Sequence, residues 1–270
     1  MRTPRHHQIL IRRGMPSRRS AGLVTASLGS ICLVVGIAPS SADASTGVRT
    51  SSSQGSLVAL PSRTMAGFTA RAPSSKKHLA TVIATFVMPS IICPRTGNSS
   101  IGVSVVVSDA SSIFAASAAG GSADATCTNG TYSAGLEAYE GPNGVVGGPN
   151  LVSPGDTIQI TVSQTRSKLA STVRDVTRGG VGVERSGRPP KNKKPVTVGV
   201  ITQGGSGTSD AVASFGTVVL SQCRLDGGPL GGAEFLHAFN LVDSADQTEI
   251  STSPFDATNT RFTETFVRAN

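Results

Sequence analysis

Residues 153–163, SPGDTIQITVS, decide the fold class of this chain. The proline fixes its own φ and the glycine permits a reversal, so the stretch begins as a tight turn. Side chains then alternate, and Ile158, Ile160 and Val162 fall on one face of an extended segment. A turn followed by a half-buried strand is typical of antiparallel β-structure.

The same pattern recurs along the rest of the chain. The sequence has 31 Gly, no Trp and two Tyr, and it is rich in Ser, Thr, Val and Ala, which favours short strands joined by turns over long helices. No segment keeps a helical period over three turns. We therefore predict an all-β sandwich or barrel. Further strands are expected at 79–88, 101–108, 131–139, 170–177, 195–202, 214–221, 234–242 and 261–268.

The N-terminal segment has the features of an export signal. Arg18 and Arg19 precede an apolar stretch over 21–38, and an A-x-A cleavage site ends at Ala44. An uncleaved membrane anchor is the alternative, but three Ser/Thr and three Gly inside the stretch disfavour it. We predict a cleaved signal peptide over 1–44, a flexible linker over 45–62, and one secreted domain over 63–270 with no membrane contact.

Charge and cysteine content exclude two classes of function. Six of the 24 basic and one of the 16 acidic residues lie in the first 44, which leaves 18 basic and 15 acidic side chains. This mild excess predicts no nucleic-acid partner. The exported part keeps Cys93, Cys127 and Cys223, so one disulfide with one cysteine left over is expected. It has no Cys-x-x-Cys spacing and only His78 and His237, so we expect neither a metal nor a cofactor.

A basic stretch over 166–194 carries nine Lys/Arg and two acids, and it ends in the loop 185–195, RSGRPPKNKKP. This loop could contact a polyanion such as a cell-wall polymer. A solvated hairpin tip is the favoured interpretation, because a charge run is usually an exposed face.

Several segments, in order, resemble the glutamic peptidase (eqolisin) family of acid endopeptidases. The resemblance covers about 63–268 and implies a concanavalin-like sandwich of two bent antiparallel sheets, with a substrate cleft on the concave face. It also implies a Cys93–Cys127 disulfide and an unpaired Cys223. The segments are 64–68 (TMAGF), 84–89 (ATFVMP), 127–139 (CTNGTYSAGLEAY), 153–157 (SPGDT), 215–218 (FGTV) and 242–244 (VDS).

The family's two catalytic groups have no counterpart here. A glutamate activates water and a glutamine donates a hydrogen bond to the developing oxyanion. By the resemblance these positions fall near Ala116 and Thr202, with Gln203 adjacent to the latter. The sequence has no Gln between residues 54 and 159 and no Glu between residues 184 and 234. Neither Thr nor Gln ionises, so we expect no base at that position.

The cleft positions implied by the resemblance are also changed. The family's tryptophans correspond to Met65, Gly102, Gly135 and Leu136, whereas Glu137 keeps a family glutamate that is not the base. The candidate cleft residues are therefore Met65, Gly102, Leu136, Glu137, Thr202 and Gln203. Asp210, which we place in a loop, is the only carboxylate between Glu184 and Glu234.

These observations predict a secreted, monomeric, catalytically inactive relative that binds a polypeptide or an extracellular polymer. We expect its groove to hold no side chain able to deprotonate water. One alternative is an active acid endopeptidase with a relocated carboxylate. Another is a lectin-like module, which the shortage of aromatic side chains disfavours.

Overall fold

The computed structural model describes residues 57–72, 80–109, 119–140, 145–149, 152–189, 197–204 and 211–268. All of these belong to the compact unit Ser52–Asn270. Their elements are β1 (Leu60–Ser62), β2 (Ala66–Arg71), β3 (Ala80–Val87), β4 (Asn98–Ser108), β5 (Ala119–Thr128), β6 (Thr131–Glu140), β7 (Val145–Pro149), β8 (Thr157–Gln164), β9 (Leu169–Asp175), β10 (Val181–Gly187), β11 (Thr197–Gly204), β12 (Ala211–Val212), β13 (Thr217–Leu225), β14 (Gly228–Pro229), the short 3-10 helix η2 (Leu230–Gly232), β15 (His237–Val242), β16 (Thr248–Thr252) and β17 (Phe262–Phe266).

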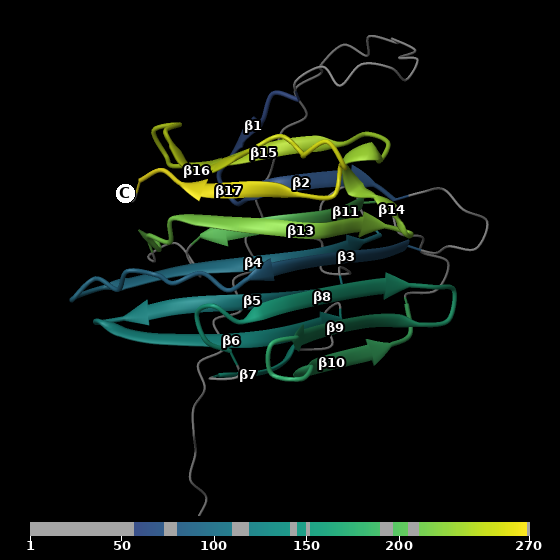
Figure 1. Ribbon diagram of the computed structural model, residues 1–270, viewed down its shortest axis with the longest axis horizontal. Helices are drawn as coiled ribbons and strands as arrows, with labels where there is room; N and C mark the ends of the chain where they lie inside the picture. Colours follow the sequence, from purple (N-terminus) through teal and green to yellow (C-terminus); the bar gives the residue numbers. More distant parts are fainter. Residues whose placement is uncertain are drawn as a thin grey trace, which may run out of the picture. The chain divides into compact units, whose positions relative to one another are not determined.

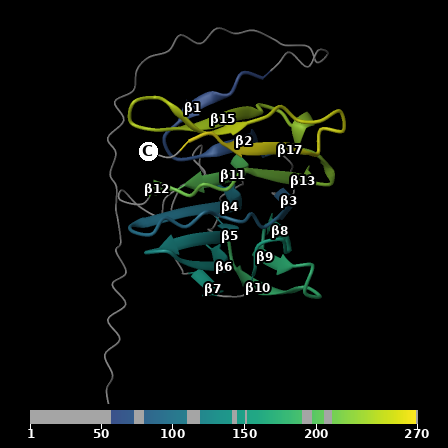
Figure 2. The same ribbon diagram turned by 60° about the vertical axis from the view of Figure 1, so that its left-hand side comes forward.

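The strands form two stacked layers (Figures 1 and 2). One layer has the order β1–β15–β2–β11–β4–β5–β6–β7. The other runs β17–β13–β3–β8–β9–β10. β16 pairs with both β15 and β17 and so joins the layers along one side. Apart from the parallel pairs β1–β15 and β12–β4, the named pairings are antiparallel, which confirms the predicted all-β antiparallel sandwich.

The core lies between the layers and follows the two-residue period of the strands. Ile158, Ile160 and Val162 of β8 are fully buried, as the alternation in the sequence predicts. Near the joined side, the rings of Phe68 and Phe262 are 4.8 Å apart, and Phe255 packs against both. Burial of these aliphatic and aromatic side chains supplies most of the stabilisation, because each contributes roughly 1.5–3 kcal/mol.

Each of the nine strands expected from the sequence overlaps an observed strand, but the sequence did not identify two long ones. Residues 119–125 of β5 are Ala, Gly, Ser and Asp, which have low strand propensity, and the strand forms because β4 and β6 pair with it on both sides. β10 lies in the basic stretch and pairs with β9, so part of that stretch forms a hairpin. Residues 190–195 of the basic loop lie outside the described ranges.

The predicted domain boundary needs one correction. Residues 60–62, assigned to the linker, form β1 and pair with β15, so the ordered part begins before residue 63. The signal peptide over 1–44 and the linker up to residue 56 lie outside the described ranges and stay predictions.

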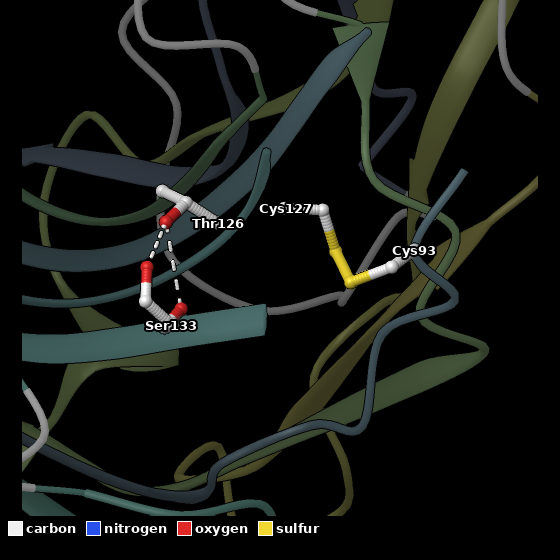
Figure 3. Close-up of a disulfide and its surroundings, with 4 residues drawn as sticks. All are labelled: Cys93, Thr126, Cys127 and Ser133. Carbon is white, nitrogen blue, oxygen red and sulfur yellow. Dashed lines mark hydrogen bonds between the residues drawn. A yellow bond between two sulfur atoms is a disulfide. The ribbon is translucent and has the colours of Figure 1, made fainter. Parts of the chain in front are cut away.

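One disulfide joins Cys93 to Cys127, as the resemblance implies, with Cα atoms 5.3 Å apart (Figure 3). It connects the segment before β4 to the end of β5. Beside it, the hydroxyl oxygens of Thr126 and Ser133 lie 2.6 Å apart across the β5–β6 ladder. Cys223 is free and buried. The bond therefore holds one end of the three-stranded β4–β5–β6 segment.

Replacing Cys93 with serine should lower the free energy of unfolding by about 3 to 4 kcal/mol, because the bond closes a loop across a sequence separation of 34 in the unfolded chain. Urea unfolding followed by circular dichroism measures the change. Reductant should cause a similar loss in the wild type and none in the variant. Equal urea concentrations at the midpoint of unfolding for the oxidised wild type and the variant would contradict the prediction.

A second feature of the core is a carboxyl group without a partner. Glu264 of β17 is fully buried, and neither of its carboxyl oxygens has a hydrogen-bond partner in the described part of the chain. Burial raises its pKa well above the usual value for glutamate. The neutral form is therefore the one compatible with the native core.

Because the pKa of Glu264 is raised on folding, the native state loses stability as pH rises above the unfolded-state pKa. The Glu264→Gln variant lacks this dependence. We expect the Tm difference between variant and wild type to be small near pH 4 and to favour the variant increasingly toward pH 8. Differential scanning calorimetry at a series of pH values measures it, and a difference that shrinks with rising pH would refute the assignment.

Candidate functional site

The candidate site lies on the outer face of the first layer, across β11, β4, β5 and β6. One cross-strand row runs through Gln203, Gly102, Asp124 and Gly135, each paired with the next. Directly paired residues project to the same face of a sheet. Gln203 and Asp124 therefore share a face, separated by a glycine that has no side chain.

The adjacent row on this face runs through Ser104, Ser122 and Glu137 to Gly147 of β7. Gly147 leaves no room for a side chain, because an added Cβ would lie 2.8 Å from the carbonyl oxygen of Leu136 and 2.9 Å from Cγ of Glu137. Small residues thus form the floor of the site, and the carboxyl groups of Asp124 and Glu137 project from it.

Two adjoining hollows follow these rows, and we call them together the groove. They measure about 640 Å³ and about 400 Å³, and they share Asp124, Thr126 and Glu137. The first is lined by Arg63, Thr64, Ser100, Ile101, Gly102, Ser104, Ser122, Asp124, Thr126, Glu137, Tyr139, Gln203 and Gly204. The second adds Ser133, Ala134, Gly135, Gly147 and Gly148.

Gly102 determines where the Asp124 carboxyl group lies. A Cβ added at Gly102 would collide with Oδ1 of Asp124, so this oxygen occupies the space that any other residue would fill. The other oxygen, Oδ2, accepts a hydrogen bond from the Ser122 hydroxyl at 2.7 Å. The carboxyl group therefore extends over β4, toward the strand that carries Gln203.

The electrostatics of the groove are set by its carboxyl groups. Burial raises the pKa of Asp124 to about 7, the hydrogen bond from Ser122 opposes this rise, and the charge of Glu137 adds to it. Burial also raises the pKa of Tyr139, with further contributions from Asp124 and Glu137. Arg63 lies at the mouth and instead pairs with Asp246 at 3.0 Å. Within the described ranges, neither Asp124 nor Glu137 forms a salt bridge.

The structure divides the predicted cleft residues between two faces. Gly102, Glu137 and Gln203 line the groove. Leu136 and Thr202 do not: both are fully buried on the core face. They occupy the row that pairs through Val103 and Ala123, one residue out of register with the groove rows.

Met65 is largely buried and packs with Val106 and Ile201 in a small cluster separate from the main core. Its neighbour Thr64 lines the groove. Ala116 and Asp210 lie outside the described ranges, so the structure places neither of them.

The sequence analysis missed Asp124, which lines the groove together with Glu137. The signal was present in the alternation of Ser122, Asp124 and Thr126, which lie across a tight hairpin from Glu137. Whether the groove holds a side chain able to deprotonate water stays a prediction.

Tyr139 closes another part of the same face. A Cβ added at Gly120 would collide with the Tyr139 ring, so the ring covers this glycine and no larger residue fits beneath it. The groove is therefore blocked beyond Ser122 along β5.

Comparison with known proteins identifies the scaffold. Residues 63–261 match the Peptidase A4 family. The chain belongs to this family. No curated protein matches the sequence.

Solved Peptidase A4 structures have the same fold. A structure of SCP-B, a member of the eqolisin family of peptidases in complex with the tripeptide Ala-Ile-His, is 16% identical with a TM-score of 0.54, and the match covers 76% of this chain and 98% of that one. Scytalido-glutamic peptidase with a peptide-based transition state analog is 19% identical with a TM-score of 0.53 and the same coverage. At this identity the likeness establishes the fold alone.

Among the described residues, no cluster of three or more His, Cys, Asp or Glu could hold a metal ion. Over the same ranges, no helix is long and apolar enough to cross a membrane. The absence of a metal and of membrane contact stays a prediction.

Two variants should shift the pKa of Asp124 in opposite directions. Glu137→Gln should lower the pKa of Asp124, because it removes a neighbouring negative charge. Ser122→Ala should raise it, because the carboxylate loses a hydrogen-bond donor. Carboxyl ¹³C NMR titration measures both. Shifts of the same sign in the two variants would contradict the description.

Proposed function

We propose that this Peptidase A4 domain binds an extended polypeptide segment in its groove and does not carry out hydrolysis at acid pH. The observation that carries the proposal is the environment of Asp124, the groove carboxyl that extends over Gly102 toward the strand that carries Gln203. Its pKa of about 7 keeps it protonated in acid. A general base must be ionised at the working pH, so Asp124 cannot activate water there.

Glu137 does not replace it in acid. Glu137 is on β6 and Gln203 on β11, and β5 and β4 lie between them. Three strand spacings place these two backbones about 14 Å apart. A base and an oxyanion donor must both reach one carbonyl group, and Asp124, two strand spacings from Gln203, is the nearer of the two carboxyl groups to that amide.

Binding is supported by the shape and composition of the groove. Its two hollows adjoin and cross several strands, which gives room for several residues of an extended chain. Ser104 and Ser122 bring hydroxyl groups to its floor. Such groups can hydrogen-bond a peptide backbone without demanding a particular side chain.

The cellular context is part of the same proposal. We infer that the protein acts outside the cell as a monomer, on a polypeptide or another extracellular polymer. The Cys93–Cys127 disulfide supports this inference, because such bonds persist in oxidising compartments.

The two alternatives have less support. An acid endopeptidase would need an ionised base beside the amide, and the pKa of Asp124 argues against one. A lectin-like site usually presents an aromatic platform. Among the described residues that line the groove, Tyr139 is the only aromatic one, and its ring packs over Gly120.

Filling the groove with a bulky side chain should weaken the binding of polypeptide. In Thr126→Trp, a bulky ring would occupy the wall shared by both hollows, and we expect the affinity for fluorescein-labelled unfolded casein to fall at least tenfold, about 1.4 kcal/mol. Fluorescence anisotropy at neutral pH measures it. Thr161→Trp, on the outer face of β8, is the matched control and should bind like the wild type.

Equal affinities for casein in the two tryptophan variants would exclude the groove as the binding site. Cleavage of casein at about pH 3 to 5 would refute the absence of acid hydrolysis, since Asp124 is protonated in that range.

A further inference from the structure

We propose that the outer face of the first layer carries a second binding site, near β15 and β2, where the ring of Phe235 stacks on a sugar ring of a neutral extracellular polysaccharide. The site lies outside the groove and does not depend on the binding of polypeptide there. It provides the aromatic platform that the groove lacks.

The site is built on β15 and β2, which pair with each other in the first layer (Figure 1). Phe68 of β2 points into the core, so by alternation Thr69 and Arg71 lie on the outer face. His237 of β15 is the direct partner of Thr69 and therefore projects to the same face. Phe235 reaches this face as well, because the guanidinium carbon of Arg71 lies 5.3 Å from the centre of its ring.

The ring of Phe235 is an open aromatic surface. The residue is 62% exposed, and among the phenylalanines and tyrosines of the described ranges it is the only exposed one. Arg71 lies over the ring, and this cation–π contact holds the ring in place. With Arg71 on one face and most of the residue exposed, the opposite face is open to a flat apolar partner.

The backbone at Phe235 indicates that the turn does not require this ring. Phe235 has a φ of 51°, in the left-handed region that bulky side chains rarely adopt. Glycine or asparagine would form the same turn with less strain. The turn is tied down by the backbone instead, since the N–H of Arg71 donates to the carbonyl oxygen of Glu234 at 3.2 Å. An exposed aromatic ring at a strained position therefore points to a role in binding rather than in folding.

The polar side chains around the ring fit the hydroxyl groups of a sugar. Arg71 offers N–H donors, Glu234 offers carboxylate acceptors, and neutral His237 offers one of each. All three side chains are exposed, and within the described ranges none of them forms a hydrogen bond or a salt bridge. Because a hydroxyl group both donates and accepts, a sugar ring above Phe235 can use all three side chains.

The aromatic surface extends further than one sugar ring. Phe239 follows His237 by two residues on β15, and the centres of the two rings lie 6.5 Å apart. Phe239 pairs with Gly67, so it projects to the same face beside a residue that has no side chain. Phe235, His237 and Phe239 together can contact successive units of a polymer.

The charges favour a neutral polymer. Arg71 and Glu234 carry opposite charges and lie next to each other, so the site attracts neither an acidic nor a basic chain strongly. A β-1,4-linked polymer of glucose or of N-acetylglucosamine has equatorial ring substituents, which leave C–H groups on the faces of each ring. Such a face can stack on Phe235 while the hydroxyl groups at the ring edge reach the polar side chains.

The test is adsorption of the purified protein to insoluble chitin and to amorphous cellulose at neutral pH, with the unbound protein measured by gel densitometry. Phe235→Asn should lower the affinity at least tenfold, about 1.4 kcal/mol. Its Tm should equal or exceed that of the wild type, because asparagine suits a φ of 51°. Val181→Asn, which replaces another exposed apolar residue on β10 of the second layer, should adsorb like the wild type.

The two polymers identify the sugar. Adsorption to chitin alone assigns the site to N-acetylglucosamine units, adsorption to cellulose alone assigns it to glucose units, and adsorption to both assigns it to the ring faces that they share. Adsorption to neither polymer overturns the proposal, as does unchanged adsorption of Phe235→Asn. Stacking on a neutral polymer is insensitive to salt, so adsorption that is lost between about 0.15 M and about 1 M NaCl would also overturn it.

Two variants separate this site from the groove. Thr126→Trp, which fills the groove, should adsorb to the polysaccharide like the wild type. Phe235→Asn should bind labelled casein like the wild type, which also shows that it folds. Loss of polysaccharide adsorption in Thr126→Trp would place the sugar in the groove and overturn the second site. Failure of the wild type to bind casein would refute the groove function and leave this site in place.

Discussion

The two-residue period of the strands in the first layer is the constraint on which the rest of the structure depends. Along β11, β4, β5 and β6, each residue faces either the core or the outer face that carries the groove, and pairing carries that assignment from strand to strand. Thr202 therefore packs in the core, whereas Gln203 faces the groove. A shift of one residue in the strand register would move a side chain from the hydrophobic core to the solvent-filled outer face.

The groove results from missing side chains, because glycine and serine replace larger residues on one face of the layer while Val and Ala on the other face keep the core packed. Gly102 illustrates the division: its neighbours Ile101 and Val103 are buried, and its own missing side chain makes room for the Asp124 carboxyl. The site can thus change chemistry without repacking the sandwich, since the two faces share a backbone but few contacts.

The sequence predicted the architecture better than the site. β8 was recognisable because Ile158, Ile160 and Val162 alternate with polar residues, whereas β5 was not, because its Gly and Ala residues are extended only through pairing with both neighbours. The resemblance pointed to a position near Thr202, with Gln203 adjacent. Adjacent residues of a strand face opposite sides of the sheet, so only the register of β11 against β4 shows which of the two faces the groove.

Glu264 and Asp124 both have a raised pKa, but a raised pKa supports a functional role only where the carboxyl group lies beside a space that a ligand can enter. Glu264 is fully enclosed, has no hydrogen-bond partner in the described ranges, and leaves no room beside Gly67 for even a methyl group. Its raised pKa concerns stability alone. Asp124 is half-buried, lines a hollow of about 640 Å³, is oriented by Ser122 and lies in one row with Gln203. The same desolvation that makes Glu264 a cost to the fold places the ionisation of Asp124 near neutrality, in a groove that is open to solvent.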